Sequence, residues 1–310
     1  MEAPNGWGWL WRISYRKPPR AERLECDGFA TGGGKAGLSG KGMIVSEPNA
    51  QHRKPQRMTK RIAFLASDAP VAQTARATLI GRYGDAEPAQ SDVIVALGGD
   101  GFMLRTLHDT QHLDVPVYGM NRGTIGFLMN EYSETDLLDR LSETEEEVIN
   151  PLSMRARDRA GRDHAALAIN EVSLLRAGPQ AAWLKITVDG RVRMAELVCD
   201  GALLATPAGS TAYNYSAHGP ILPIGADVLA LTAIAAFRPR RWRGALLPKS
   251  AHVRFDVLDP VKRPVMADAD SISIKDIDWV EIRSEPAISH RILFDPGHGL
   301  EERLISEQFS

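Results

Sequence analysis

The chain has 310 residues, of which 44% are hydrophobic and 25% charged, and its formal net charge is −2. That length suffices for two domains, each with a core of its own. The near-neutral charge excludes a broad electrostatic attraction to nucleic acid or to an anionic membrane, so any phosphate binding must be local. The most apolar long stretch, 228–237, is about half the length needed to span a bilayer. We therefore expect neither nucleic acid nor a membrane as partner.

Residues 1–57 differ in composition from the rest. They mix tryptophans, arginines and glycines without a helical or strand period, and "WGWLW" is too short for the apolar part of a secretory signal. We expect a disordered leader or a mis-assigned start, with the functional chain beginning near Met58. A regulatory or membrane-touching arm is the alternative. Cys26 and Cys199 fit no disulfide framework or metal motif, which favours a reducing, cytoplasmic location.

From Met58 to residue 150, strand-like and helix-like segments alternate. "RIAFLAS", "DVIVALG" and "VPVYGMN" are strand-like, whereas "VAQTARATLIGRYG" and "FMLRTLHDT" carry apolar residues at helical spacing. The acidic segment "SETDLLDRLSETEEE" is typical of a solvated helix. This alternation predicts a doubly wound parallel sheet in an α/β domain, whose ligands bind at the carboxyl ends of the strands.

Beyond residue 150 the pattern shifts toward strands. "WLKITVDGRVRMAELV" is a hairpin that turns at Asp189-Gly190, and "HAALAINEVSLLRA", "HVRFDVLD", "SISIKDIDWVEIRS" and "RILFDP" are strand-like. Only 210–217 and 227–237 are helix candidates here, before a final helix in "GHGLEERLISEQFS". We therefore divide the chain into the leader (1–57), the α/β domain (58–150), a mostly-β domain (151–290) and a C-terminal tail (291–310).

The stretch "DVIVALGGDGFML" places a carboxylate among glycines at the end of a buried strand. Gly98, Gly99 and Gly101 can take positive φ and let backbone N–H groups approach a phosphate, toward which the following helix directs its positive end. Arg105 in that helix joins this predicted phosphate-binding and ATP-binding set. Asp100 repels phosphate, so it must act on the proton of an attacking hydroxyl or on Mg²⁺. A turn in which Asp100 caps the helix is the structural alternative.

Two further segments concentrate polar residues. Asn170 and Glu171 interrupt the apolar run "ALAINEVSLL", where a buried pair without partners would be costly, so we interpret them as hydrogen-bonding groups for a sugar or base. An edge position facing water is the alternative. "CDGALLATPAGSTAYNYSAHGP" gathers more polar groups beside a helix start than a capped helix needs, which indicates a binding surface. Its polar residues are Asp200, Thr206, Ser210, Thr211, Tyr213, Asn214 and Ser216.

Taken together, "GGDG", "GMNRGTIGFL", "NE" and "DG(x)4TPxGSTAY", in this order, resemble the NAD kinases from residue 61 to the end of the chain. The resemblance implies transfer of the terminal phosphate of ATP to the 2′-hydroxyl on the adenosine ribose of NAD, with Mg²⁺ or another divalent cation as cofactor. Polyphosphate remains open as a further donor. The implied fold is a Rossmann-like domain followed by a β-sandwich-like domain, with the tail returning to the first domain. The implied assembly is a homodimer or homotetramer.

The resemblance also assigns roles in NAD binding. Asp100 lies at the 2′-hydroxyl with Gly101 in the same loop, Asn170 and Glu171 hold the adenosine, and Phe127 packs on the base. The other members of the implied NAD site are Asp200 at the nicotinamide end, Ala208, Thr211, Ala212, Tyr213, Ser216 and, from a neighbouring subunit, Ala235. Whether Asp100 is the base or a metal ligand stays open. Phe102 stands where other members of the family often have Thr or Asn, and Ala208 where many have a hydroxyl residue, so the preferred phosphate donor also stays open.

Two rival functions share part of this pattern. A lipid kinase also carries the glycine turn, but it needs an acyl channel and has no use for the "NE" and "GSTAY" groups. A non-catalytic nucleotide sensor could use the phosphate cradle, yet it gains nothing from a carboxylate at Asp100. The sequence therefore favours NAD kinase.

Overall fold

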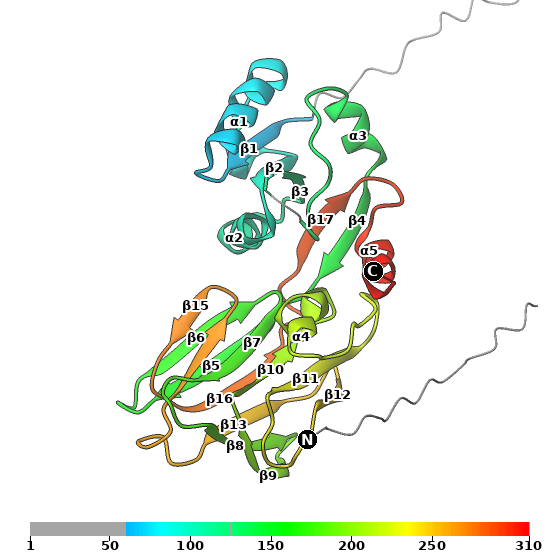
Figure 1. Cartoon of the computed structure of the whole chain (residues 1–310). Coiled ribbons are helices and arrows are strands. Elements are labelled where there is room, and N and C mark those ends of the chain that lie inside the picture. The colour runs from blue at the N-terminus through cyan, green and yellow to red at the C-terminus, as the bar shows by residue number, and fades with distance from the viewer. Residues whose placement is uncertain (1–59, 124–125, 310) are drawn as a thin grey trace, which may run out of the picture. The chain divides into compact units, whose positions relative to one another are not determined.

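The computed structural model of the chain describes residues 60–123 and 126–309 (Figure 1). The predicted leader lies outside the described residues. The helices are α1 (Pro70–Tyr83), α2 (Asp100–Thr110), α3 (Leu137–Glu143), α4 (Tyr213–Ser216) and α5 (Leu300–Gln308), with 3-10 turns η1 (Pro88–Gln90) and η2 (Ala208–Thr211). The strands are β1 (Ile62–Ala66), β2 (Val93–Gly98), β3 (Val117–Asn121), β4 (Glu145–Ile149), β5 (Leu152–Asp158), β6 (Asp163–Ala168), β7 (Glu171–Arg176), β8 (Ala182–Val188), β9 (Arg191–Cys199), β10 (Gly201–Ala205), β11 (Val228–Ile234), β12 (Gly244–Pro248), β13 (Val253–Val257), β14 (Val265–Ala269), β15 (Ile272–Ile274), β16 (Ile277–Ser284) and β17 (His290–Phe294).

The first sheet has the strand order β1-β2-β3-β17-β4. Its first four strands run parallel and β4 runs antiparallel to β17. Strand β2 is buried along its whole length, because α1 and α3 supply apolar side chains to one face of the sheet and α2 and α5 to the other. This is the predicted Rossmann-like, doubly wound arrangement. The tail returns to it as β17, which lies between β3 and β4 (Figure 1).

The second half of the chain forms two six-stranded antiparallel sheets, in the orders β12-β11-β10-β7-β14-β15 and β6-β5-β16-β13-β8-β9. Alternate residues of strands such as β8 and β13 point into one apolar cluster that both sheets share. The predicted hairpin turns at Asp189 and Gly190, which both have positive φ, as a two-residue turn requires. The β-sandwich-like domain that the sequence predicts is thereby confirmed.

Three helix predictions were wrong in part. Most of the segment 227–237 is strand β11, which is buried on both faces and so has the same unbroken apolar run as a buried helix. The acidic helix ends at Glu143, and the glutamates beyond it form edge strand β4, where Arg291 of β17 pairs with Glu146. The segment 210–217 forms the end of η2 and the single turn α4 rather than one helix.

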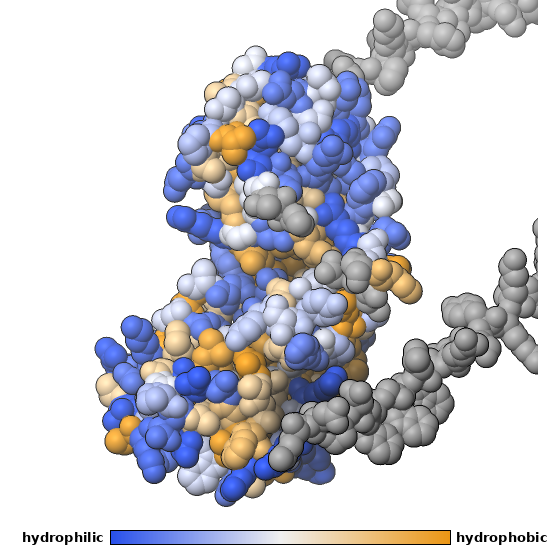
Figure 2. Space-filling view, viewed as in Figure 1, coloured by the Kyte–Doolittle hydropathy of each residue, from blue (hydrophilic) through white to orange (hydrophobic). Residues whose placement is uncertain are grey.

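Hydrophilic residues cover most of the face shown in Figure 2, with smaller apolar groups between them. Among the described residues, no helix is long and apolar enough to cross a membrane.

Candidate active site

The glycine turn joins β2 to α2. Gly98 ends β2, Gly99 precedes the helix in an extended conformation, and Asp100 is the first helical residue. None of Gly98, Gly99 and Gly101 has positive φ, so the turn does not need the conformational freedom that we expected of them. At Gly98 the reason for glycine is space, because an added Cβ would lie 2.7 Å from the Cβ of Phe102.

Both carboxylate oxygens of Asp100 accept backbone hydrogen bonds from one loop. The N–H of Phe127 donates to Oδ2 at 2.6 Å and the N–H of Leu128 donates to Oδ1 at 2.8 Å. Gly126 lets this loop approach, since a Cβ there would lie 3.1 Å from Oδ1 and 2.6 Å from the Cγ of Met129. Asp100 therefore does not cap its own helix, and its carboxylate has a fixed orientation.

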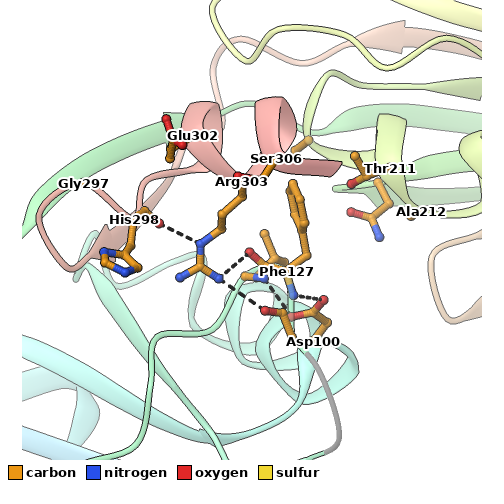
Figure 3. Close-up of a pocket in the computed structure, with 13 residues that line it drawn as sticks. Asp100, Phe127, Thr211, Ala212, Gly297, His298, Glu302, Arg303 and Ser306 are labelled. Carbon is orange, nitrogen blue, oxygen red and sulfur yellow. Dashed lines mark hydrogen bonds between the residues drawn. The ribbon is translucent and has the colours of Figure 1, made fainter. Parts of the chain in front are cut away.

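Asp100 faces a cavity of about 640 Å³ (Figure 3). Of the predicted NAD-site residues, the cavity brings together Asp100, Phe127, Asn170, Ala208, Thr211 and Ala212. Sequence reasoning missed the other lining residues, which are Gly126, Leu128, Gly297, His298, Glu302, Arg303 and Ser306. The last five come from the tail. Spacing along the chain gave no signal for them, because only the return of β17 to the first sheet brings the tail here.

The turn that contains Asn170 is held by an acid that the sequence did not single out. Asp270 accepts the backbone N–H of Ile169 at 2.7 Å and that of Asn170 at 3.0 Å. Its Oδ2 also lies 2.7 Å from Nε2 of His108, on α2. The helix that begins at Asp100 is thus tied to the Asn170 turn through one side-chain pair.

Glu171 begins β7 beside this turn. Its Oε2 is buried and has no hydrogen-bond partner within the described part of the chain. Burial, and secondly the charge of Asp270, raise the pKa of Glu171 to about 7, while the backbone N–H of Tyr213 acts in the opposite direction. A buried acceptor without a partner is rare in folded proteins, and a hydroxyl or amino group of a ligand would satisfy it.

Three polar residues of the "TPAGSTAYN" segment have structural roles, so their assignment to a binding surface was wrong. The hydroxyl of Thr206 donates to a backbone carbonyl at 2.7 Å, the hydroxyl of Ser210 accepts a backbone N–H at 3.0 Å, and the amide of Asn214 donates to the carbonyl of Ser210 at 3.0 Å. All three are buried. They hold the turn whose backbone passes so close to Asn170 that a Cβ on Gly209 would lie 2.3 Å from the Asn170 carbonyl oxygen.

Several predicted site residues do not line the cavity. Asp200 forms an ion pair with Arg176 at 2.6 Å, and Ser216 and Ala235 are exposed. Tyr213 packs on a small apolar cluster between α4 and β10. Glu171, Gly98 and Gly99 also lie outside the cavity lining.

Gly101 and Arg105 line a second hollow, of about 500 Å³, at the carboxyl end of β1. Ser67 and Asp68 lie in its wall. Arg105 is exposed and lies 3.6 Å from Asp109, one turn further along α2. The glycine turn therefore stands between two hollows, one on the Asp100 side and one on the Arg105 side.

Arg303 reaches from α5 to the loop that holds Asp100 (Figure 3). Its Nη1 donates to the carbonyl oxygens of Gly126 at 3.2 Å, Phe127 at 3.0 Å and Met129 at 2.7 Å. Burial lowers the pKa of Arg303, and the nearby carboxylates of Asp100 and Asp295 oppose this.

Known proteins resemble this chain over most of its length. The chain matches two family models, described as the ATP-NAD kinase N-terminal domain over residues 41–146 and the ATP-NAD kinase C-terminal domain over residues 169–286. The chain belongs to the NAD kinase family, a family of phosphotransferases. It is 73% identical over 250 residues to an NAD kinase of Cereibacter sphaeroides, which covers 81% of this chain and 98% of that protein. It is 60% identical over 257 residues to an NAD kinase of Caulobacter vibrioides, which covers 83% and 99%.

Solved structures of the NAD kinase family have the same fold. The yeast NADH kinase complexed with NADH superposes with a TM-score of 0.69 at 22% identity, covering 86% of this chain and 92% of that one. An NAD kinase from Archaeoglobus fulgidus in complex with ATP superposes with a TM-score of 0.63 at 24% identity, covering 80% and 98%. At such identities the likeness supports the fold of this chain.

Proposed function

We propose that this chain phosphorylates NAD, transferring the terminal phosphoryl group of ATP to the 2′-hydroxyl on the adenosine ribose to give NADP. The observation that carries the proposal is the anchored carboxylate of Asp100, which faces one cavity with Asn170, Thr211 and Ala212. The relatives at 60–73% identity are NAD kinases, and solved members of the fold are described with NADH or ATP bound.

In the proposed complex the adenosine half of NAD occupies the 640 Å³ cavity. Phe127 packs on the base and Asn170 hydrogen-bonds the nucleoside. Glu171 follows Asn170 but lies outside the lining, so in this proposal it turns its buried Oε2, which has no partner among the described residues, toward the nucleoside. The small side chains of Ala208 and Ala212 leave room for the ligand, and Thr211 supplies a hydroxyl. These assignments put the 2′-hydroxyl within reach of Asp100.

Asp100 acts in this proposal on the hydroxyl proton. The N–H groups of Phe127 and Leu128 hold both oxygens in place, and each oxygen keeps a lone pair with which it can accept the proton as the ribose oxygen attacks phosphorus. Because the carboxylate is already oriented, little reorganisation is needed at the moment of reaction. Such assistance typically supplies about 10²–10⁴ in rate.

We place the ATP phosphates at the glycine turn, on the side of the 500 Å³ hollow that Gly101 and Arg105 line. The N-terminus of α2 and the side-chain-free backbone at Gly99 and Gly101 suit an anion there. Polyphosphate is the alternative donor that the same groups could hold.

A divalent cation fits this site only together with the nucleotide. Within residues 60–123 and 126–309 no cluster of three or more His, Cys, Asp or Glu side chains could hold a metal ion. Mg²⁺ is commonly bound by one or two carboxylates with substrate phosphates and water, so Asp100 with the ATP phosphates would suffice. Bound there, the cation would neutralise charge on the transferred phosphoryl group.

The proposal extends to assembly and location. Ala235 lies outside the cavity lining, as expected if a neighbouring copy in a homodimer or homotetramer brings it to the site. Phe237 is 56% exposed close to Ala235 and offers apolar surface for that contact. We further propose a cytoplasmic enzyme, in keeping with the absence of a disulfide framework among its two cysteines.

An acceptor and donor panel tests the proposal. The purified chain is mixed with Mg²⁺, radiolabelled ATP or polyphosphate, and either NAD, NADH or diacylglycerol, and the products are separated. We expect ATP-dependent label on NAD, at the ribose 2′ position. Label on diacylglycerol would indicate a lipid kinase, and nucleotide binding without transfer to any acceptor would indicate a sensor.

A further inference from the structure

The loop that anchors Asp100 is held from its other side by the C-terminal helix. Nη1 of Arg303 donates to the carbonyls of Gly126 and Phe127, while the N–H groups of Phe127 and Leu128 donate to Asp100. The carbonyl of Gly126 and the N–H of Phe127 belong to one peptide group, 126–127. The carbonyl of Phe127 and the N–H of Leu128 belong to the next, 127–128. Each peptide group therefore lies between the guanidinium and the carboxylate, with its carbonyl toward the cation and its N–H toward the anion (Figure 3).

This arrangement has a direct electrostatic consequence. Hydrogen bonds in series polarise one another, so a cation on the carbonyl side strengthens the N–H donors on the other side. Arg303 also restrains the loop directly, because the same nitrogen, Nη1, donates a third hydrogen bond to the carbonyl of Met129 at 2.7 Å. Because Arg303 donates its hydrogen bonds to backbone carbonyls, it does not occupy the oxygens of Asp100, while its positive charge stabilises the ionised carboxylate.

We propose that Arg303 is a positioning residue for phosphoryl transfer: through peptides 126–127 and 127–128 it orients Asp100 toward the acceptor hydroxyl. The inference rests on the proposed function, and it makes the C-terminal helix part of the reaction machinery. The carboxylates that act on Arg303 are those of Asp100 and of Asp295, which follows β17, and His298 and Glu302 lie in the cavity wall. Leu300 of α5 is buried in the same core cluster as α2, and this contact fixes the position of the helix that carries Arg303.

The test compares Arg303→Met, which keeps the stem without charge or donors, with Arg303→Lys, which keeps both charge and donors. Arg291→Met is the matched control, since Arg291 lies in the same tail but pairs with Glu146 at the surface. Turnover and NAD affinity are measured for each, together with circular dichroism. We expect Arg303→Met to lower kcat by roughly 10-fold to 100-fold with the Kd for NAD within about threefold. Arg303→Lys should recover most of kcat, and Arg291→Met should change little.

The same substitutions in an Asp100→Asn background separate positioning from a purely structural role. If Arg303 acts through Asp100, the two losses are not additive, and Arg303→Met should lower the residual rate of Asp100→Asn by less than about threefold. Three results would overturn the inference. They are an equal fold-loss of kcat on Arg303→Met in both backgrounds, a rise in the Kd for NAD without a fall in kcat, and a kcat of Arg303→Met close to that of the unaltered chain. If Arg303→Met does not fold, Arg303→Gln, which keeps donors without charge, takes its place. A chain that never phosphorylates NAD, or an Asp100→Asn variant with full turnover, would contradict the proposed function instead.

Discussion

Asp100 and Glu171, two acids of the proposed site, have opposite surroundings. Asp100 accepts hydrogen bonds from two backbone N–H groups, whereas Oε2 of Glu171 is buried, feels the charge of Asp270 and has no hydrogen-bond partner among the described residues. Glu171 therefore lowers the stability of the free protein at neutral pH and above, and in the proposed complex its carboxylate accepts a hydrogen bond from the nucleoside. Such local costs are common where a protein binds a ligand.

Glu171→Gln should stabilise the free protein at high pH. The folded-state pKa of about 7 lies above the ordinary value of 4.5, so the neutral form is favoured by folding and that stability is lost as pH rises through 7. At pH 8 the variant should be more stable than the unaltered chain by at most roughly 3 kcal/mol, and at pH 4.5 the difference should vanish. Denaturant unfolding at both pH values measures this, with exposed Glu87→Gln as control. A Glu171→Gln variant of equal or lower stability at pH 8 would contradict the pKa assignment.

Among the elements, two turns must pass each other closely at the cavity. Thr206 and Ser210 hold η2 with buried hydroxyls, and Gly209 lies against the Asn170 turn, which Asp270 and His108 tie to α2. The position of Asn170 relative to Asp100 therefore depends on contacts among α2, η2 and the loop before β15.

Gly209→Ala tests this close approach. Its Cβ would lie 2.3 Å from the Asn170 carbonyl oxygen, so either the protein loses roughly 2–4 kcal/mol of stability or the two turns separate. We expect a lower free energy of unfolding together with weaker NAD binding. Gly81→Ala is the matched control, because Gly81 lies inside α1 with no atom within 4 Å of an added Cβ, and it should stabilise by about 0.5–1 kcal/mol. Equal free energies of unfolding for Gly209→Ala and Gly81→Ala would show that the two turns can move apart without cost, which would contradict the close approach.

Prediction from sequence succeeded where a pattern is local and failed where packing decides. The Asp189-Gly190 hairpin and the β2–α2 glycine turn carry their own signals, and both were found. Strand β11 has no alternation because both of its faces are covered, and the glutamates of β4 form a strand because β17 pairs with them. Asp270 and Arg303 were missed for the same reason, since each acts on a loop more than 90 residues away in the chain.

At the scale of the whole molecule, the two family models match residues 41–146 and 169–286. The match to the Cereibacter sphaeroides relative spans 250 residues and 98% of that protein. The C-terminal segment is part of the fold, because β17 is an inner strand of the first sheet and residues of α5 line the cavity.

A chain that begins at Met58 should therefore fold and retain full turnover. The measurement is thermal unfolding with steady-state kinetics, compared with the full-length chain. A second truncation beginning at Pro70 is the control, because it removes β1 and its five pairings with β2 and should not fold. Loss of activity in the chain from Met58 would mean that residues 1–57 contribute to the enzyme, as a regulatory arm would.

The turnover of Asp100→Asn with ATP and NAD tests the central claim most directly. Asparagine keeps the size of the side chain and one acceptor oxygen, but it cannot take the hydroxyl proton. With the fold intact and the Kd for NAD within about threefold of the unaltered chain, kcat should fall by about 10²–10⁴. Turnover close to that of the unaltered chain would remove Asp100 from the chemistry and contradict the account.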